Sequence, residues 1–571
     1  MLKRNQEHLK SEARRILLAV TPFWDPLIPP QGIASIKAFL QEKGFTVKTV
    51  DTNTESQFLD AYDNYFDFIK TFVPENKRGN FYSIGHFVLQ NQMIAHFNHD
   101  DEARYLELVK ILVYKTFYTE IDDSQAFELM KILDRFFENL RTYFLDLLAE
   151  FKPDVLGLTV NTGTFPAAMY VFKLAKEHYP NIKNIMGGNI FADQMALGTP
   201  NFEFLLEKTE TYIDKIMIGQ GELLLHKYLT GQFPEEQRVY TREDLKGEVL
   251  GFKDMRLPDL SDYNMAIYPY LGATGSASCK FMCSFCNSVK YYGDFRMKDI
   301  RQTVSEIGSL HREYGNQLFF MTDSMLNPIV EELSDHVIRE ELPVYYDAYF
   351  RIDKESADVD RTLKWRRGGF YRARIGVESG SQRILDAIHK QVTLDDTRAA
   401  VRGLAYAGIK TTTYWVVGLP GETEEDFQQT LDLLEELKND IWQAECAQFD
   451  YYYAGQASSD EWAEKRMLLY PEWAKDMLIS QSWILDCPPT REETYQRIFR
   501  FAEHCKKLGI PNPYSLPEIR EADERWRRLH KNAVPSMLDF KKNKIAFAER
   551  DNVKKLLTVR TTVDDEGDFG F

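Results

Sequence analysis

Short apolar runs alternate with helix-like segments in the first third of the chain. Each of two sets begins with an apolar run, continues with apolar residues at helical spacing, and ends with a second apolar run. The two sets lie at 15–20, 29–40 and 44–51, and at 154–160, 166–179 and 184–188. Strand, helix and strand in this order predict two βαβ units that share a parallel sheet.

The stretch between these units, residues 54–148, has helical periodicity and is rich in Phe and Tyr. It predicts a helical insertion between the second and third strands, whose aromatic side chains serve helix packing. From 240 to 260, charged residues, Gly and Pro become frequent, which is typical of a linker.

The alternation returns in the middle of the chain. We expect helices at 299–314 and 395–407, and strands at 317–322, 344–350, 373–377 and 411–417. Repeated βα units at this spacing predict a complete or partial barrel, whose chemistry lies at the C-terminal ends of its strands. Beyond about residue 455 the pattern is helical and irregular.

The predicted fold class is therefore α/β, with a Rossmann-like N-terminal domain, a partial TIM barrel of the (β/α)6 type and a helical C-terminal domain. A chain of 571 residues is long enough for several domains. The boundaries we predict are 1–238 for the first domain, 239–262 for the linker, 263–455 for the barrel and 456–571 for the last domain. We expect this last domain to close the substrate side of the barrel.

Composition narrows the functional class. Apolar residues make up 44% of the chain and charged residues 27%, as in a globular protein, and no apolar run is long enough to span a bilayer. The polar start and short apolar run at 16–20 do not resemble a signal peptide, so we expect a cytoplasmic location. The net charge of −17 opposes binding to phosphate backbones, so nucleic acid is not an expected partner.

Three cysteines, Cys279, Cys283 and Cys286, form a C-x3-C-x2-C cluster with no nearby fourth. A [4Fe-4S] cluster usually takes four cysteines, so three would leave one iron open to a small molecule. A structural zinc site needs four ligands, and the nearest downstream histidine is His311. The pattern favours an iron–sulfur site, with zinc and a disulfide as the remaining alternatives.

This spacing, with Phe285 before the last cysteine, resembles the signature of radical S-adenosylmethionine (SAM) enzymes. The resemblance implies that three thiolates hold a [4Fe-4S] cluster whose open iron chelates SAM. It also implies that an electron from a flavodoxin- or ferredoxin-type donor cleaves SAM to a 5'-deoxyadenosyl radical.

Later segments resemble the strand motifs of the same family. They are 319–324, 349–353, 376–382 and 414–422, whereas 449–456, in the region of the sixth strand, lacks the family's usual Pro-x-Pro-Gly-Thr ending. The residues that the resemblance implies for SAM binding are Phe285, Asp323, Arg351, Glu378, Ser379 and Gly418.

The N-terminal part resembles the cobalamin-binding domain of the B12-dependent branch of this family. The residues implied for cobalamin are Trp24, Asn161, Thr162, Thr164, Gly187, Gly188, Gly219, Gly221 and Glu222. Small residues at the strand ends would let the corrin and its nucleotide tail approach the backbone. The chain has no Asp-x-His-x-x-Gly motif, so we expect no histidine from such a motif below the cobalt.

Together these resemblances predict a cobalamin-dependent radical SAM enzyme. Methyl transfer from methylcobalamin to an unactivated carbon or phosphorus of a small molecule or peptide is the expected reaction. Cyclisation or ring rearrangement without methyl transfer is an alternative. A third possibility is an electron-transfer iron–sulfur protein, which would need a fourth ligand from Cys446, Cys487 or Cys505.

Overall fold

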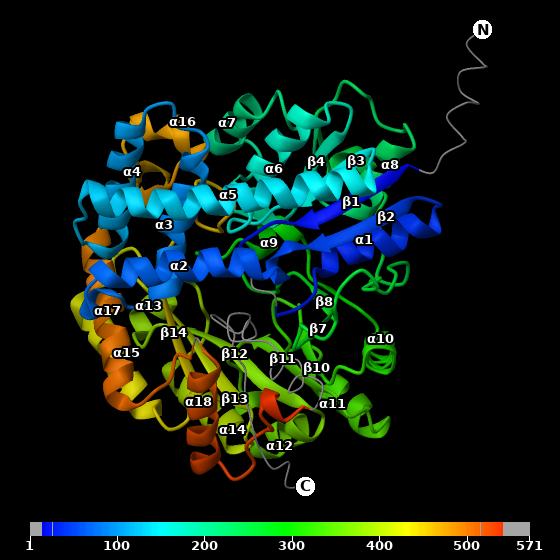
Figure 1. The fold of residues 1–571 in the computed structure, drawn as a ribbon. Coiled ribbons are helices and arrows are strands. Elements are labelled where there is room, and N and C mark those ends of the chain that lie inside the picture. The colour runs from blue at the N-terminus through cyan, green and yellow to red at the C-terminus, as the bar shows by residue number, and fades with distance from the viewer. Residues whose placement is uncertain (1–13, 25–26, 194, 514, 541–571) are drawn as a thin grey trace.

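The computed structural model describes residues 14–24, 27–193, 195–513 and 515–540 and contains two six-stranded parallel sheets (Figure 1). The first sheet has the order β2-β1-β3-β4-β5-β6. Its strands are β1 (Arg15–Val20), β2 (Thr46–Asp51), β3 (Val155–Thr159), β4 (Lys183–Gly187), β5 (Lys215–Ile218) and β6 (Val239–Thr241). The strand order reverses between β1 and β3, and ligands bind at such a switch point in doubly wound sheets.

Both faces of this sheet are covered, which explains why the central strand is apolar throughout. In β1, Ile16, Leu18 and Val20 pack toward one face, while Leu17 and Ala19 pack toward the other. The helices of the sheet are α1 (Gln31–Glu42), α6 (Phe165–His178), α7 (Pro200–Lys208) and α8 (Gly221–Leu229).

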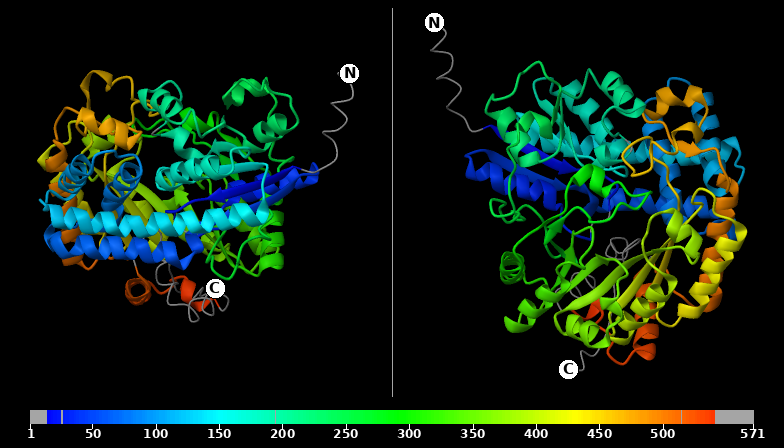
Figure 2. Two further views of the ribbon diagram at one scale, coloured as in Figure 1. Left: turned by 45° about the horizontal axis from the view of Figure 1, so that its top comes forward. Right: turned by 180° about the vertical axis from the view of Figure 1, so that it is seen from behind.

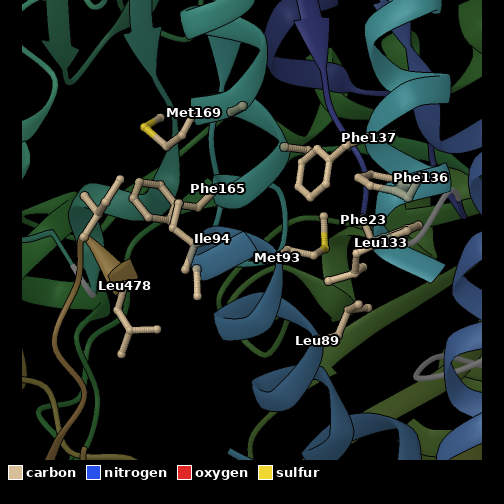
Figure 3. Close-up of a cluster of buried hydrophobic side chains, with 14 of the residues drawn as sticks. Phe23, Leu89, Met93, Ile94, Leu133, Phe136, Phe137, Phe165, Met169 and Leu478 are labelled. Atoms are coloured by element: carbon tan, nitrogen blue, oxygen red, sulfur yellow. The ribbon is translucent and has the colours of Figure 1, made fainter. Parts of the chain in front are cut away.

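The predicted helical insertion is present and packs against the first sheet. It consists of α2 (Ser56–Phe72), α3 (Phe81–His96), α4 (Glu102–Phe117) and α5 (Asp123–Phe151), and α2 and α5 run side by side along the molecule (Figure 2). Figure 3 shows Met93 of α3 and Phe136 of α5 gathered around Phe23, which follows β1. The ring of Phe23 lies 5.2 Å from that of Phe136. The insertion therefore shares one hydrophobic core with the first sheet.

The second sheet is the predicted partial barrel, with the order β14-β13-β12-β11-β10-β7. Its strands are β7 (Leu271–Ala273), β10 (Leu318–Met321), β11 (Tyr345–Phe350), β12 (Phe370–Glu378), β13 (Lys410–Val417) and β14 (Gln443–Gln448). The sixth strand thus precedes the segment 449–456 that we had assigned to its region. Its sequence is Gln-Ala-Glu-Cys-Ala-Gln and has no β-branched residue. Pairing with β13, and not the local strand propensity, therefore makes this segment a strand.

Helices pack around the barrel sheet and connect its strands. They are α10 (Ile300–Tyr314), α11 (Val330–Arg339), α12 (Val359–Arg367), α13 (Gln382–Ala387), α14 (Leu394–Tyr406) and α15 (Glu424–Leu437). A small hairpin and helix lie between β7 and α10, namely β8 (Ser276–Ala277), α9 (Ser288–Tyr292) and β9 (Arg296–Met297). Figure 1 places α9 between the two sheets.

The C-terminal part of the described chain packs against both halves of the molecule. It contains β15 (Arg466–Leu468), α16 (Lys475–Leu478), β16 (Trp483–Leu485), α17 (Arg491–Leu508) and α18 (Leu516–Leu529). Tyr470 and Leu478 join the core of the insertion, and α17 packs on β14. None of the described helices is long and apolar enough to cross a membrane.

Candidate functional site

The three predicted cluster cysteines lie in one loop between β8 and α9. Pairing of β8 with β9 closes this loop at its base. Cys283 is buried, and Cys279 and Cys286 are half-buried. Burial raises the pKa of the Cys279 thiol, and the nearby Cys286 and Cys283 raise it further. The three cysteines thus lie in one short loop, close enough for Cys286 and Cys283 to influence the titration of Cys279.

Hydrogen bonds hold this cysteine loop from two sides. The amide of Ser284 donates to the carbonyl of Ile388, directly after α13 (3.0 Å). The segment after β14 supplies three further donors on the other side. They are the amides of Ala457 and Ser458, which donate to the carbonyls of Cys286 and Ser284, and the side-chain amide of Gln456, which donates to the carbonyl of Phe285.

Asp323 follows β10 and anchors the start of the cysteine loop. The amide of Gly275 donates to one carboxylate oxygen (3.0 Å), and the hydroxyl of Ser276 donates to the other (2.5 Å). The side chain is fully buried, and this burial raises its pKa to about 6. Both oxygens thus have protein partners, and a contact of Asp323 with SAM stays a prediction.

Arg351 comes directly after β11 and reaches the cysteine loop. Its Nη1 lies 3.6 Å from the sulfur of Cys283, and its guanidinium lies over the ring of Phe281 at 3.7 Å. The side chain is buried, and its Nη2 has no hydrogen-bond partner among the described residues. Burying an unpaired donor is costly, so this geometry suits a carboxylate ligand beside Cys283.

Glu378 ends β12 and forms a buried ion pair with Lys390 (2.6 Å). A methyl group on Gly376 would lie 2.3 Å from the Glu378 carboxylate and 2.9 Å from the Lys390 ammonium, so glycine leaves room for the pair. Lys390 is two residues from Ile388, which holds the cysteine loop. Sequence reasoning missed Lys390 because it lies outside every motif.

The other predicted SAM residues lie near the same end of the barrel. Ser379 follows β12, and its buried hydroxyl accepts a hydrogen bond from the amide of Ser381 (3.1 Å). Gly418 follows β13 with a left-handed φ of 82°, and its amide donates to Glu422 (2.8 Å). Phe285 packs against the barrel core. Their contacts with SAM stay predictions.

Across from the barrel, the loops after β1 and β3 meet at the switch point of the first sheet. The amide of Phe23 donates to the carbonyl of Gly163 (3.2 Å), which joins the two loops. Trp24, Asn161 and Thr162 line a cavity of about 650 Å³ between the first sheet and the barrel. These three predicted cobalamin residues are therefore brought together.

The remaining predicted cobalamin residues have protein neighbours. Thr164 is buried, and its hydroxyl accepts a hydrogen bond from the amide of Asn161 (2.9 Å). A methyl group on Gly188 would lie 2.3 Å from the amide nitrogen of Val160, so close backbone packing requires this glycine. Burial raises the pKa of Glu222. Of the described residues, Gly187, Gly188, Gly219, Gly221 and Glu222 lie outside the cavity lining, and their contacts with cobalamin stay predictions.

The cavity also exposes residues that sequence reasoning missed. Arg374 of β12 forms a buried two-pronged ion pair with Asp347 of β11, at 2.7 Å for each bond, and donates to the hydroxyl of Tyr414 (3.2 Å). From the insertion, Tyr62 and His86 meet at 2.9 Å. Alternation along the predicted strands is the signal that could have identified Arg374 and Tyr414 as lumen-facing, whereas nothing in the sequence placed the insertion here.

The other three cysteines lie elsewhere. Cys446 in β14 and Cys505 in α17 are buried near each other, and burial together with Cys505 raises the pKa of Cys446. Cys487 precedes α17. Within the described ranges, no three His, Cys, Asp or Glu side chains are arranged to hold a single metal ion.

Comparison with known proteins agrees with this geometry. Residues 275–434 match the model of the Radical SAM superfamily. The chain carries a radical SAM domain. The matched region contains the cysteine loop and the strands β10 to β13, which confirms the resemblance that these segments suggested, together with the iron–sulfur cluster and SAM that it implied.

Curated relatives of this chain include enzymes of two reaction classes. An anaerobic magnesium-protoporphyrin IX monomethyl ester cyclase of Cereibacter sphaeroides is 28% identical over 53% of this chain and 52% of its own. The cobalamin-dependent radical SAM methyltransferase TokK of Streptomyces tokunonensis is 27% identical over 50% of this chain and 46% of its own. The chain thus spans about half the length of these relatives.

Among solved structures, the chain is similar to TsrM from Kitasatospora setae, a radical SAM methyltransferase solved with cobalamin and a [4Fe-4S] cluster bound. The TM-score is 0.53 at 14% identity, over 87% of this chain and 89% of TsrM. At this identity the likeness concerns the fold. It confirms the predicted α/β fold class over most of both chains.

The buried ion pair next to the cysteine loop leads to a stability prediction. Replacing Lys390 by Met leaves the Glu378 carboxylate buried without its cation, so we expect stability to fall by about 3 kcal/mol. Adding Glu378→Gln removes the unpaired charge and should restore part of the loss. Urea unfolding followed by tryptophan fluorescence compares the variants, and a double variant as unstable as Lys390→Met would contradict the assignment.

The raised pKa of Asp323 predicts a pH dependence of stability. Because its pKa is about 6 in the folded chain and ordinarily 3.8, the folded state holds this proton more tightly. Its contribution to stability is therefore present at low pH and is lost as the pH rises from about 4 to about 6, by up to about 3 kcal/mol. Asp323→Asn should flatten this part of the profile, measured as urea midpoints between about pH 4 and 7. Equal slopes for both proteins would exclude Asp323 as the source.

Proposed function

We propose that this protein is a cobalamin-dependent radical SAM enzyme that transfers a methyl group to an unactivated carbon or phosphorus centre of a small molecule or peptide. The observation that carries this proposal is the position of one cavity. It lies between the switch point of the first sheet and the lumen of the barrel. A methyl donor on one side and a radical on the other would reach one substrate there.

The cysteine loop and Arg351 fit the iron–sulfur cluster and SAM. Cys279, Cys283 and Cys286 would hold the cluster, and the unpartnered Nη2 of Arg351 would bind the SAM carboxylate. Glu378, held by Lys390, is the second candidate contact. When bound, these cofactors supply a radical that removes a hydrogen atom from the substrate, and cobalamin supplies the methyl group.

The loops after β1 and β3 fit cobalamin. Trp24, Asn161 and Thr162 border the cavity at the switch point, where doubly wound sheets bind their ligands. The similarity to TsrM over most of both chains supports this assignment, because that structure was solved with cobalamin bound. The chain's own residues would orient the cofactor and exclude water from the space it shares with the substrate.

The residues that line the cavity indicate which chemical group of the substrate the cavity would bind. Tyr349 from the barrel lines the cavity and is 42% exposed. Aromatic surfaces held open in a concave site favour a planar or apolar substrate group. Tyr62 and His86 add polar contacts from the insertion. A substrate with an apolar ring and polar edges suits this lining.

Cyclisation is the second candidate function. The cyclase relatives from Cereibacter sphaeroides and Rubrivivax gelatinosus, at 28% and 25% identity, favour it. In that case the radical would lead to ring formation, and no methyl group would be transferred. Product mass separates the two, because methylation adds a CH2 unit and cyclisation does not.

The cluster assignment predicts the behaviour of cysteine variants. In anaerobically reconstituted protein with dithionite and SAM, the wild type should release 5'-deoxyadenosine. Cys283→Ala should lose this cleavage by at least about a hundredfold and bind less than the roughly four irons of the intact cluster. Cys487→Ala is the matched control and should keep both. Cleavage by Cys283→Ala at the wild-type rate would refute the assignment.

The cobalamin assignment predicts a spectroscopic result. Protein purified anaerobically with added cobalamin should retain a stoichiometric corrinoid, seen in its visible spectrum after gel filtration. Asn161→Trp would fill the switch point and should abolish retention, while the iron content stays unchanged. A wild-type protein that elutes without corrinoid but still cleaves SAM would contradict the cobalamin part of the proposal alone.

A further inference from the structure

The segment that carries the three cysteines has a positive net charge, although the chain as a whole is acidic with a net charge of −17. Residues 276–298 contain four basic residues and one acidic residue. Four exposed cations lie in or beside this segment, and none of them forms an ion pair with another described residue. They are Arg242, Lys280, Lys290 and Arg296.

The structure draws these cations together. Pairing of β8 with β9 places Arg296 opposite Ala277, two residues before Cys279. The ammonium of Lys280 lies 4.8 Å from the ring of Phe295. A methyl group on Gly293 would lie 3.1 Å from Nη1 of Arg242, which brings a cation of the N-terminal half to the same place.

Two methionines are exposed in this region. Met282 in the cysteine loop is 49% exposed, and Met297 in β9 is 46% exposed. Methionine and arginine are enriched at protein interfaces, where a flexible thioether adapts to a partner. A surface that combines exposed methionines with unpaired cations has the composition typical of a protein–protein interface.

We propose that this cysteine-loop face is the docking surface of a small acidic electron-transfer protein. The face is defined by Arg242, Lys280, Met282, Lys290, Arg296 and Met297. The proposal rests on the proposed function, because only a redox site at the three cysteines needs an electron. One electron passes from the reduced partner to the site that the cysteines hold, the partner leaves oxidised by one electron, and no atom is transferred.

Position and charge both support this occupant. Lys280 and Met282 are sequence neighbours of Cys279 and Cys283, and consecutive residues are about 3.8 Å apart, so a partner docked on them lies within about 10 Å of the sulfurs. Redox complexes use small interfaces that charge complementarity steers and that dissociate readily. A neutral or basic partner would gain nothing from the unpaired cations.

The test compares two reductants on the same loaded protein. Lys290→Glu with Arg296→Glu reverses two charges of the face, and Arg104→Glu with Arg135→Glu reverses two exposed charges of the insertion as the matched control. With reduced flavodoxin, the face variant should form 5'-deoxyadenosine at least about tenfold more slowly than the control at low salt. With dithionite, all three proteins should react within about twofold, since a small reductant needs no docking.

Binding provides a second readout that does not depend on turnover. Calorimetric titration with oxidised flavodoxin should show an affinity at least about tenfold weaker for the face variant than for the control, and wild-type affinity should fall as salt rises toward about 0.3 M. Equal flavodoxin affinity and equal rates for both variants would overturn the docking surface. Failure of every protein with dithionite would instead refute the proposed function.

Discussion

The site depends on one constraint, which is that a loop without regular structure must hold three sulfurs in place. Cys279, Cys283 and Cys286 gain their position from hydrogen bonds to partners far away in the sequence, at Ile388 and in segment 456–458. Asp323 fixes the start of the loop through Gly275 and Ser276. Buried backbone N–H and C=O groups need hydrogen-bond partners, so the hydrogen bonds that these groups form also determine the shape of the loop. The barrel and the segment after β14 can therefore be viewed as the scaffold of this loop.

The same loop also links the two halves of the molecule. The side chain of Asn287 donates to the carbonyl of Ala192 (3.0 Å), and the hydroxyl of Tyr292 donates to Asn189 (3.2 Å), both in the segment after β4 of the first sheet. The cysteine loop is thus tied to the sheet edge that faces the cavity. The spacing between the two sides of the cavity is set by direct contacts of the loop and does not rely on the linker alone.

The spacing of apolar residues was enough to predict the elements that bury one face or both faces. The apolar run 15–20, the helical insertion and the barrel strands β10 to β13 were predicted because a buried element shows a period in its sequence, whereas the short first barrel strand, β7, was not predicted. The predicted position of the sixth strand, β14, was wrong. This strand has no β-branched residue, and it forms because it pairs with β13. Lys390 was missed for a related reason. Lys390 reaches Glu378 from the segment after α13, and this contact across 12 residues leaves no pattern in the residues around Lys390.

The insertion supplies the part of the cavity wall that carries none of the predicted cofactor residues. The cysteine loop and the sheet edge are fixed by backbone hydrogen bonds, so changes there would disturb the cofactor positions. Helices α2 and α3 contribute residues to the cavity lining, including Tyr62 and His86, and the insertion is also held at its far end, where the side chain of Arg491 donates to the carbonyl of Lys115 (3.3 Å). Substrate choice is therefore expected to reside in α2 and α3 more than in the radical SAM domain.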